Sequence, residues 1–93
     1  MIPLKSYAES LGFFVSDGFK YGVDLLLYTD HPSKVHSKYA LLLDRNQSFF
    51  EIVAIQRVCC SVNKRLIFVK ENEGKYEFYW IRRSINLNKK WDE

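Results

Sequence analysis

Five consecutive apolar residues, Tyr39–Leu43, stand between the charged residues Lys38 and Asp44. Successive side chains of a β-strand point to opposite faces of the sheet, so a strand that is apolar at every position has both faces buried. This run therefore predicts a strand that packs against the rest of the chain on both of its faces.

Two helices and four further strands are expected around this strand. Apolar residues at helical spacing predict a first helix that Gly12 ends, and a longer second helix that Ser48 and Glu51 begin as a capping box. Aromatic and β-branched runs separated by turn residues predict two hairpins. The expected elements are a helix over 4–11, strands over 13–15 and 23–28 joined by a turn over 16–18, a loop over 29–35, a strand over 38–44, a helix over 49–62, and strands over 65–70 and 76–83 joined by an acidic turn over 71–74. This order predicts an α/β fold, a small sheet domain with two helices.

Length and composition limit the class of protein. A chain of 93 residues builds one compact domain, which excludes a multidomain enzyme. Hydrophobic residues make up 47% of the chain, with two prolines and four glycines, so enough apolar surface can be buried to exclude intrinsic disorder. The apolar runs are much shorter than the roughly 20 residues that cross a bilayer, so we expect a soluble protein. The polar tail 84–93 is expected to be loosely held.

Charge and cysteine usage bear on the partner and on the compartment of the protein. The net charge is +3, but residues 1–44 carry four basic and five acidic groups, whereas residues 45–93 carry ten basic and six acidic groups. Positive charge in the second half suits nucleic acid, although such a charge is also common on ordinary surfaces. Cys59 and Cys60 are adjacent and form no CxxC pair, which favours a reducing compartment. The start of the chain lacks a secretory signal.

Many catalytic classes have no counterpart in the sequence. There is no glycine-rich phosphate loop, no HExxH or GxSxG motif and no carboxylate cluster suited to magnesium. His31 and His36 lie five residues apart without cysteine or carboxylate companions at useful spacing, so a zinc site is not expected. We expect neither a metal nor a cofactor.

Three short segments together carry a family resemblance. They are K-Y-G-x-D at 20–24 within the stretch 18–28, H-S-x-Y at 36–39 and S-V-x-K at 61–64. Their order and separation resemble the catalytic domain of tRNA-splicing endonucleases, over about residues 4–83. The resemblance implies a small mixed β-sheet flanked by helices, with a restriction-endonuclease-like fold. It also implies cleavage of precursor tRNA at exon–intron junctions without a metal, leaving a 2′,3′-cyclic phosphate and a 5′-hydroxyl.

The resemblance assigns the catalytic residues to Tyr28, His36 and Lys64. Attack by a 2′-hydroxyl needs a proton acceptor, a proton donor for the departing 5′-oxygen and a cation near the phosphorus. An imidazole is partly protonated near neutrality, which suits His36 as the acid, and Lys64 supplies the cation. Tyr28 acts as the base, or it orients the 2′-hydroxyl while water or phosphate takes the proton. Taken singly, each residue also has an ordinary reading: a tyrosine that caps the core, a loop histidine and a solvated lysine at a helix end.

The resemblance also implies two residues that bind RNA. Arg57 precedes Lys64 by close to two helical turns, so it projects to a similar side if the helix continues. In the family, an arginine here and a second Arg or Trp on a later strand sandwich a bulged base at the partner subunit's active site. Trp80 fits the second position, with Tyr79 and Arg82 as neighbouring alternatives.

The expected partners are precursor tRNA, with its bulge-helix-bulge or intron junction, and other subunits. The acidic turn Glu71–Glu73 resembles a family loop that inserts into a neighbouring subunit, although it is also a plain hairpin turn. The chain is expected to assemble as a homo-oligomer, as archaeal members do, or as a hetero-oligomer, as the yeast and animal enzymes do. Family chains usually carry a further N-terminal domain, so this chain is either a minimal subunit or a truncated one.

The alternatives to a catalytic subunit are a noncatalytic structural subunit of the same complex and a generic RNA-binding domain. The compartment is the nucleus if the source is eukaryotic and the cytoplasm if it is archaeal.

Overall fold

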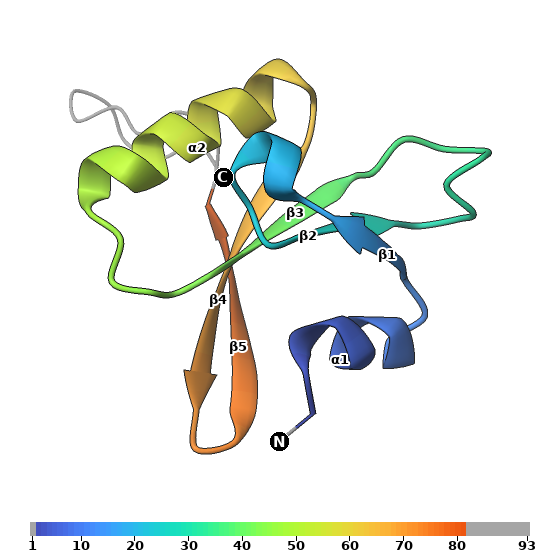
Figure 1. Ribbon diagram of the computed structural model, residues 1–93, viewed down its shortest axis with the longest axis horizontal. Helices are drawn as coiled ribbons and strands as arrows, with labels where there is room; N and C mark the ends of the chain where they lie inside the picture. Colours follow the sequence, from blue (N-terminus) through green and yellow to red (C-terminus); the bar gives the residue numbers. More distant parts are fainter. Residues whose placement is uncertain (1, 82–93) are drawn as a thin grey trace.

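The computed structural model describes residues 2–81 and contains two α-helices, one 3-10 turn and five strands (Figure 1). The polar tail 84–93 and the end of the last expected strand, residues 82–83, lie outside the described residues. In chain order the elements are α1 (Leu4–Ser10), β1 (Phe14–Asp17), η1 (Phe19–Tyr21), β2 (Leu25–Tyr28), β3 (Tyr39–Leu43), α2 (Phe49–Ser61), β4 (Arg65–Asn72) and β5 (Lys75–Ile81). Within residues 2–81, no helix is long and apolar enough to span a membrane.

The strands form one mixed sheet in which spatial order follows chain order, β1-β2-β3-β4-β5. Three neighbouring pairs are antiparallel, and only β3 and β4 run parallel. A parallel pair needs a long crossover, and here α2 supplies it between β3 and β4. The predicted α/β fold with a small mixed sheet is confirmed.

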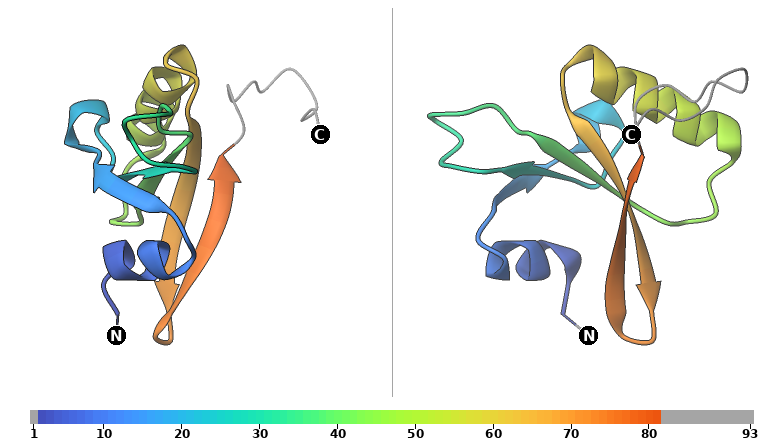
Figure 2. Two further views of the ribbon diagram at one scale, coloured as in Figure 1. Left: turned by 90° about the vertical axis from the view of Figure 1, so that its right-hand side faces the viewer. Right: turned by 180° about the vertical axis from the view of Figure 1, so that it is seen from behind.

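The two helices cover opposite faces of the sheet (Figures 1 and 2). We call these the α2 face and the α1 face. The core of the α2 face includes Cys59 from α2 together with Tyr21 and Tyr28, and the core of the α1 face includes Leu4 and Ala8 from α1. Two layers of buried side chains therefore sandwich the sheet.

β3 lies at the centre of this sandwich. Its residues Ala40 and Leu42 point into the α2 face and are 0% and 2% exposed, while Leu41 points into the α1 face and is 1% exposed. The prediction of a strand buried on both faces is confirmed.

The chain between the first two strands differs from the expectation. Instead of a plain turn over 16–18, β1 continues through Asp17 and is followed by the 3-10 turn η1. The Asp17 carboxylate accepts a hydrogen bond from the Phe19 N–H at 2.8 Å, which favours this turn. β2 consequently begins at Leu25 rather than at Val23.

The acidic turn is also shorter than expected. β4 extends to Asn72, which pairs with Lys75, so only Glu73 and Gly74 form the turn. Both have positive φ, 51° and 79°, as in the two-residue hairpins whose twist matches that of the strands. Glu71 is therefore a strand residue, and it is exposed like Glu73.

Helix α2 begins as predicted but buries fewer of its apolar residues than expected. Ser48 Oγ accepts from the Glu51 N–H at 3.2 Å, and Glu51 Oε1 accepts from the Ser48 N–H at 3.0 Å, which confirms the capping box. Gln56 and Cys59 are its buried residues. Several apolar side chains expected on the packed sides of the two helices are instead exposed: Leu11, Phe49, Val58 and Val62.

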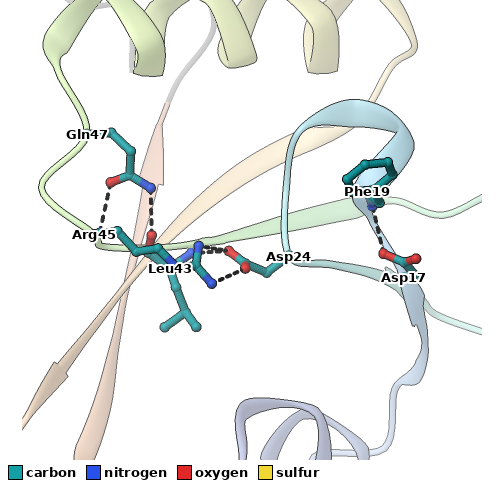
Figure 3. A network of polar contacts seen from close by, with 6 residues as sticks. All are labelled: Asp17, Phe19, Asp24, Leu43, Arg45 and Gln47. Atoms are coloured by element: carbon teal, nitrogen blue, oxygen red, sulfur yellow. Dashed lines mark hydrogen bonds and ion pairs between the residues drawn. The ribbon is translucent and has the colours of Figure 1, made fainter.

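A polar network joins the start of β2 to the end of β3 (Figure 3). Asp24 Oδ2 accepts from the Leu43 N–H at 2.7 Å and from Arg45 Nη1 at 3.0 Å, and Asp24 Oδ1 pairs with Arg45 Nη2. Gln47 continues the network by donating to the Leu43 carbonyl at 2.8 Å. Asp24, the last residue of the K-Y-G-x-D motif, therefore has a structural role.

We predict that Asp24→Ala destabilises the domain more than Arg45→Ala does. The first change leaves the Leu43 N–H without its acceptor and costs about 1–3 kcal/mol of unfolding free energy. The second removes an exposed guanidinium and costs about 1 kcal/mol or less. Urea unfolding of both variants measures the difference, and equal losses would contradict the assigned role of Asp24.

A second prediction concerns Cys59, a thiol with 0% exposure. Burial raises the pKa of Cys59 to about 11, with the neighbouring Cys60 adding to the rise and Lys64 opposing it. Because an unfolded thiol titrates near pH 9, the unfolded chain loses this proton first. Stability is therefore full below pH 9 and falls between about pH 9 and 11, by about 2–3 kcal/mol for this group.

Unfolding free energies measured from pH 8 to 11 test this in wild type and Cys59→Ala. The wild type should lose more stability with rising pH than the variant, whose other titrations are unchanged. Cys60→Ala is the matched control, since it removes an exposed thiol but leaves the burial that is the largest cause of the raised Cys59 pKa, so it should keep most of the wild-type slope. A Cys59→Ala slope identical to that of the wild type would refute the prediction.

Candidate active site

One end of the sheet brings together the three segments that hold Tyr28, His36 and Lys64. Leu27 pairs with Tyr39 across β2 and β3, and Tyr39 pairs with Arg65 across β3 and β4. Just outside these pairs, the Lys38 N–H donates to the Leu27 carbonyl and the Arg65 N–H donates to the Lys38 carbonyl, both at 2.9 Å. The end of β2 and the starts of β3 and β4 are thus hydrogen-bonded side by side.

Tyr28 ends β2 with its ring on the α2 face. The ring is half-buried against the core of that face. Its hydroxyl oxygen accepts a hydrogen bond from Ser16 Oγ at 3.1 Å, across the β1–β2 pair. The Tyr28 ring therefore covers part of the α2-face core, as the sequence allowed.

Lys64 is positioned by the way in which α2 ends. The Lys64 N–H donates to the Cys59 carbonyl at 2.8 Å, and the Asn63 N–H donates to the Cys60 carbonyl at 3.1 Å. With Asn63 at a φ of 59°, this is the Schellman arrangement that closes a helix. It turns the chain directly from α2 into β4, with Lys64 as the connecting residue.

The Lys64 side chain is half-buried and reaches toward the loop between β2 and β3. Its Nζ donates to the Ser37 carbonyl at 3.3 Å and lies 5.3 Å from the centre of the Tyr21 ring. Tyr21 and Tyr28 both pack against the α2-face core. The ammonium group therefore lies on the same side of the sheet as the Tyr28 ring.

His36 lies in the loop between β2 and β3, which projects away from the helices in Figure 1. Its side chain is exposed, and it makes no hydrogen bond or ion pair with another residue of the described part, 2–81. The next residue, Ser37, is 6% exposed and provides the carbonyl that Lys64 contacts. The fold thus brings the backbone beside His36 to the Lys64 ammonium.

Arg57 and Trp80 are not brought together within the chain. Arg57 is exposed on α2, which ends at Ser61, so helical spacing does not relate it to Lys64. Arg57 and Lys64 would project to a similar side only if the helix continued to Lys64, and it does not. Trp80 pairs with Ile67, whose side chain belongs to the α1 face, so the sheet lies between the two. The Trp80 ring is 45% exposed and lies 4.7 Å from the Arg65 guanidinium.

Sequence reasoning missed three residues that shape this end of the sheet: Tyr21, Ser37 and Asn63. Asn63 had a readable signal, because asparagine tolerates positive φ and often follows the last residue of a helix. Tyr21 and Ser37 belong to the K-Y-G-x-D and H-S-x-Y motifs, but nothing in the local sequence assigned a role to either side chain. Within residues 2–81, no three His, Cys, Asp or Glu side chains are grouped closely enough to hold a metal ion.

We predict that Asn63→Val destabilises the chain by about 1–2 kcal/mol, since a β-branched residue at φ near 59° is strained. Asn63→Gly is the matched control, because glycine adopts this conformation without a steric penalty and should be close to neutral. Thermal or urea unfolding compares the two variants. Equal stability of both would show that the helix end does not constrain this position.

Two kinds of comparison identify relatives of this chain. Residues 5–78 match the family model of the tRNA intron endonuclease catalytic C-terminal domain. The chain is 37% identical over 90 residues to the tRNA-splicing endonuclease subunit Sen2-1 of Arabidopsis thaliana, which covers 90% of this chain and 34% of that protein. It is 34% identical over 79 residues to the tRNA-splicing endonuclease of Thermoplasma volcanium, covering 84% of this chain and 27% of that protein.

A third relative, the tRNA-splicing endonuclease of Saccharolobus solfataricus, is 33% identical over 79 residues, covering 76% of this chain and 43% of that protein. The chain thus spans about a quarter to two fifths of the length of these relatives. The family model matches most of the described residues, and these identities agree with it. The chain therefore belongs to the tRNA intron endonuclease family, and the part of the family that it matches is the catalytic C-terminal domain.

Proposed function

We propose that this domain cleaves precursor tRNA as a metal-independent RNA endonuclease and thereby removes introns. The observation that carries the proposal is the contact between the Lys64 ammonium and the Ser37 carbonyl, on the face where Tyr28 lies and beside His36. The contact supports a site that the three family residues share. The family relatives named as tRNA-splicing endonucleases support the substrate class.

The proposed reaction uses three side chains of this chain and the 2′-hydroxyl of the substrate. The ribose 2′-oxygen attacks the adjacent phosphorus and loses its proton to the base, for which the deprotonated oxygen of Tyr28 is the candidate, so that Tyr28 becomes a neutral phenol. The bond from phosphorus to the 5′-oxygen breaks, and the His36 imidazolium gives its proton to that oxygen. Lys64 stabilises the negative charge that builds on the non-bridging oxygens. The products are a 2′,3′-cyclic phosphate and a 5′-hydroxyl.

Tyr28 has two possible roles in this scheme. Its hydroxyl oxygen accepts from Ser16, which leaves its own proton free to point toward a substrate oxygen. In that arrangement it orients the 2′-hydroxyl, and water or phosphate takes the proton. The Tyr28→Phe variant distinguishes the two roles, because loss of a base reduces cleavage more than loss of one orienting hydrogen bond.

RNA binding is proposed to involve Arg57 and Trp80 on separate surfaces of the chain. The exposed guanidinium of Arg57 suits contact with a phosphate or the face of an unpaired base. The half-exposed Trp80 ring beside Arg65 offers a stacking surface on the α1 face. Because these surfaces are on opposite sides of the sheet, one base cannot lie between Arg57 and Trp80 of the same chain.

We also propose that the chain assembles with further subunits, which are either identical to it or different. The exposed Glu71 and Glu73 at the β4–β5 hairpin suit docking into a basic groove of a neighbouring subunit. The working compartment is then the nucleus in a eukaryote and the cytoplasm in an archaeon.

We predict that the chain, alone or with partner subunits, cleaves intron-containing precursor tRNA in excess EDTA and leaves cyclic-phosphate ends. His36→Ala and Lys64→Ala should each reduce cleavage by about 100-fold or more, because each removes a group used in the transition state. Their RNA affinity should stay within about 3-fold of wild type. Arg57→Ala should mainly disturb cleavage at the partner's site. Gel analysis of product ends and a binding titration measure these effects.

Matched controls separate catalysis from loss of charge. His31→Ala removes the other histidine of the same loop, and Lys70→Ala removes a positive charge from the opposite end of β4. Both should keep cleavage near wild type. Products with 3′-hydroxyl ends that require a metal would falsify the chemistry. RNA binding without cleavage in any combination would favour a noncatalytic subunit.

A further inference from the structure

Lys64 is held by two contacts of different kinds. One is the hydrogen bond from Nζ to the Ser37 carbonyl at 3.3 Å, and the other is the Tyr21 ring, whose centre lies 5.3 Å from Nζ. A cation within about 6 Å of an aromatic ring centre is attracted by the electrons of the ring face. The ring and the carbonyl together restrict a long side chain that would otherwise have many rotamers.

Tyr21 is itself fixed by the 3-10 turn that carries it. The ring is half-buried against the α2-face core. Gly18, at the start of the turn, has no room for a side chain, because an added Cβ would lie 2.5 Å from Val23 Cγ2 and 3.0 Å from the Val23 carbonyl oxygen. Gly22, at its end, has a φ of 78°, which favours glycine. The two glycines that flank the turn therefore fix the backbone that carries the Tyr21 ring.

The chemistry of these two contacts leaves Lys64 able to act on an anion. An aromatic ring attracts an ammonium group without neutralising its charge, whereas a carboxylate would cancel it. Within residues 2–81, Lys64 forms no ion pair with an acidic side chain. An ammonium group has three N–H donors, and the Ser37 carbonyl accepts one of them, so the other two can face phosphate oxygens.

We propose that Tyr21 is the positioning residue for Lys64: its ring fixes the ammonium group, and with it the cation of the RNA cleavage site. This inference rests on the proposed function. Tyr21 does not contact the reacting atoms in this scheme and acts only through Lys64. It also gives the Tyr of the K-Y-G-x-D motif a role separate from that of Asp24, which holds the opposite end of β2.

Activity measurements on Tyr21→Leu and Tyr21→Phe test the proposal. Leucine keeps an apolar side chain in the core but removes the ring, so kcat should fall by about 10-fold or more, with KM within about 3-fold of wild type. Phenylalanine keeps the ring face and should restore kcat to within about 3-fold of wild type. The matched control is Tyr39→Leu, because Tyr39 is also half-buried and its ring lies 5.8 Å from the Lys38 ammonium. It should leave kcat within about 3-fold of wild type.

A spectroscopic measurement tests the placement without relying on activity. In wild type, the NMR signals of the Lys64 ε-methylene protons should be displaced upfield by the Tyr21 ring current. The displacement should persist in Tyr21→Phe and in Tyr39→Leu, and it should be lost in Tyr21→Leu. Thermal unfolding checks that each variant is folded.

The outcomes separate this inference from the proposed function. An undisplaced Lys64 signal in wild type, or a displacement that survives in Tyr21→Leu, overturns the positioning role whatever the activity. Equal kcat losses in Tyr21→Leu and Tyr39→Leu also overturn it, because they indicate general destabilisation. A displaced signal in a wild-type chain that never cleaves RNA overturns the proposed function instead, and with it the catalytic part of this inference.

Discussion

The burial of β3 on both faces determines where the other elements lie. Ala40, Leu41 and Leu42 are almost completely inaccessible, so both faces of the strand need a covering layer. α1 covers one face and α2 covers the other. Because α2 also connects β3 to β4, those two strands run parallel and start at the same end of the sheet. The location of the candidate site at that end follows from how the core is covered.

The two ends of the central strands differ in role: one end is tied together by a polar network, and the other carries the candidate site. At one end, Asp24 and Arg45 tie the start of β2 to the end of β3 through hydrogen bonds and an ion pair. At the other end, the chain segments carry Tyr28, His36 and Lys64, and besides the backbone hydrogen bonds between these segments, the Lys64 side chain donates a hydrogen bond to the Ser37 carbonyl. The K-Y-G-x-D motif spans this division, since Tyr21 lies beside Lys64 whereas Asp24 lies in the ion-paired network.

Local patterns were enough to predict most of the elements of this fold. Apolar runs, helical spacing and the Ser48–Glu51 capping box depend on neighbours in the sequence, and each predicted an element that the structure contains. The 3-10 turn η1 was missed because the Asp17 carboxylate, which accepts from the Phe19 N–H, stands in a segment that reads equally well as a plain turn. The exposure of Phe49 and Val58 was not predicted, because the spacing of apolar residues indicates which side of a helix packs but not how much of that side the sheet covers.

The site was harder to derive than the fold, since its geometry depends on contacts between distant parts of the chain. The family motifs pointed to Tyr28, His36 and Lys64, but spacing alone could not show that the Lys64 ammonium meets the Ser37 carbonyl, 27 residues away. The condition under which Arg57 and Lys64 would project to a similar side, a helix that continues to Lys64, is not met, because α2 ends at Ser61 and the left-handed Asn63 follows it.

That helix end has a wider consequence for the charge at the site. Because the chain turns at Asn63, Lys64 leaves the helix and enters the sheet, and its side chain lies along the α2 face. There it meets a ring and a carbonyl, which hold an ammonium group while leaving its net charge intact. A carboxylate in either position would hold the lysine more strongly but would remove the charge that a phosphate needs. The contacts around Lys64 are those expected where a cation must be both fixed in position and available to an anionic ligand.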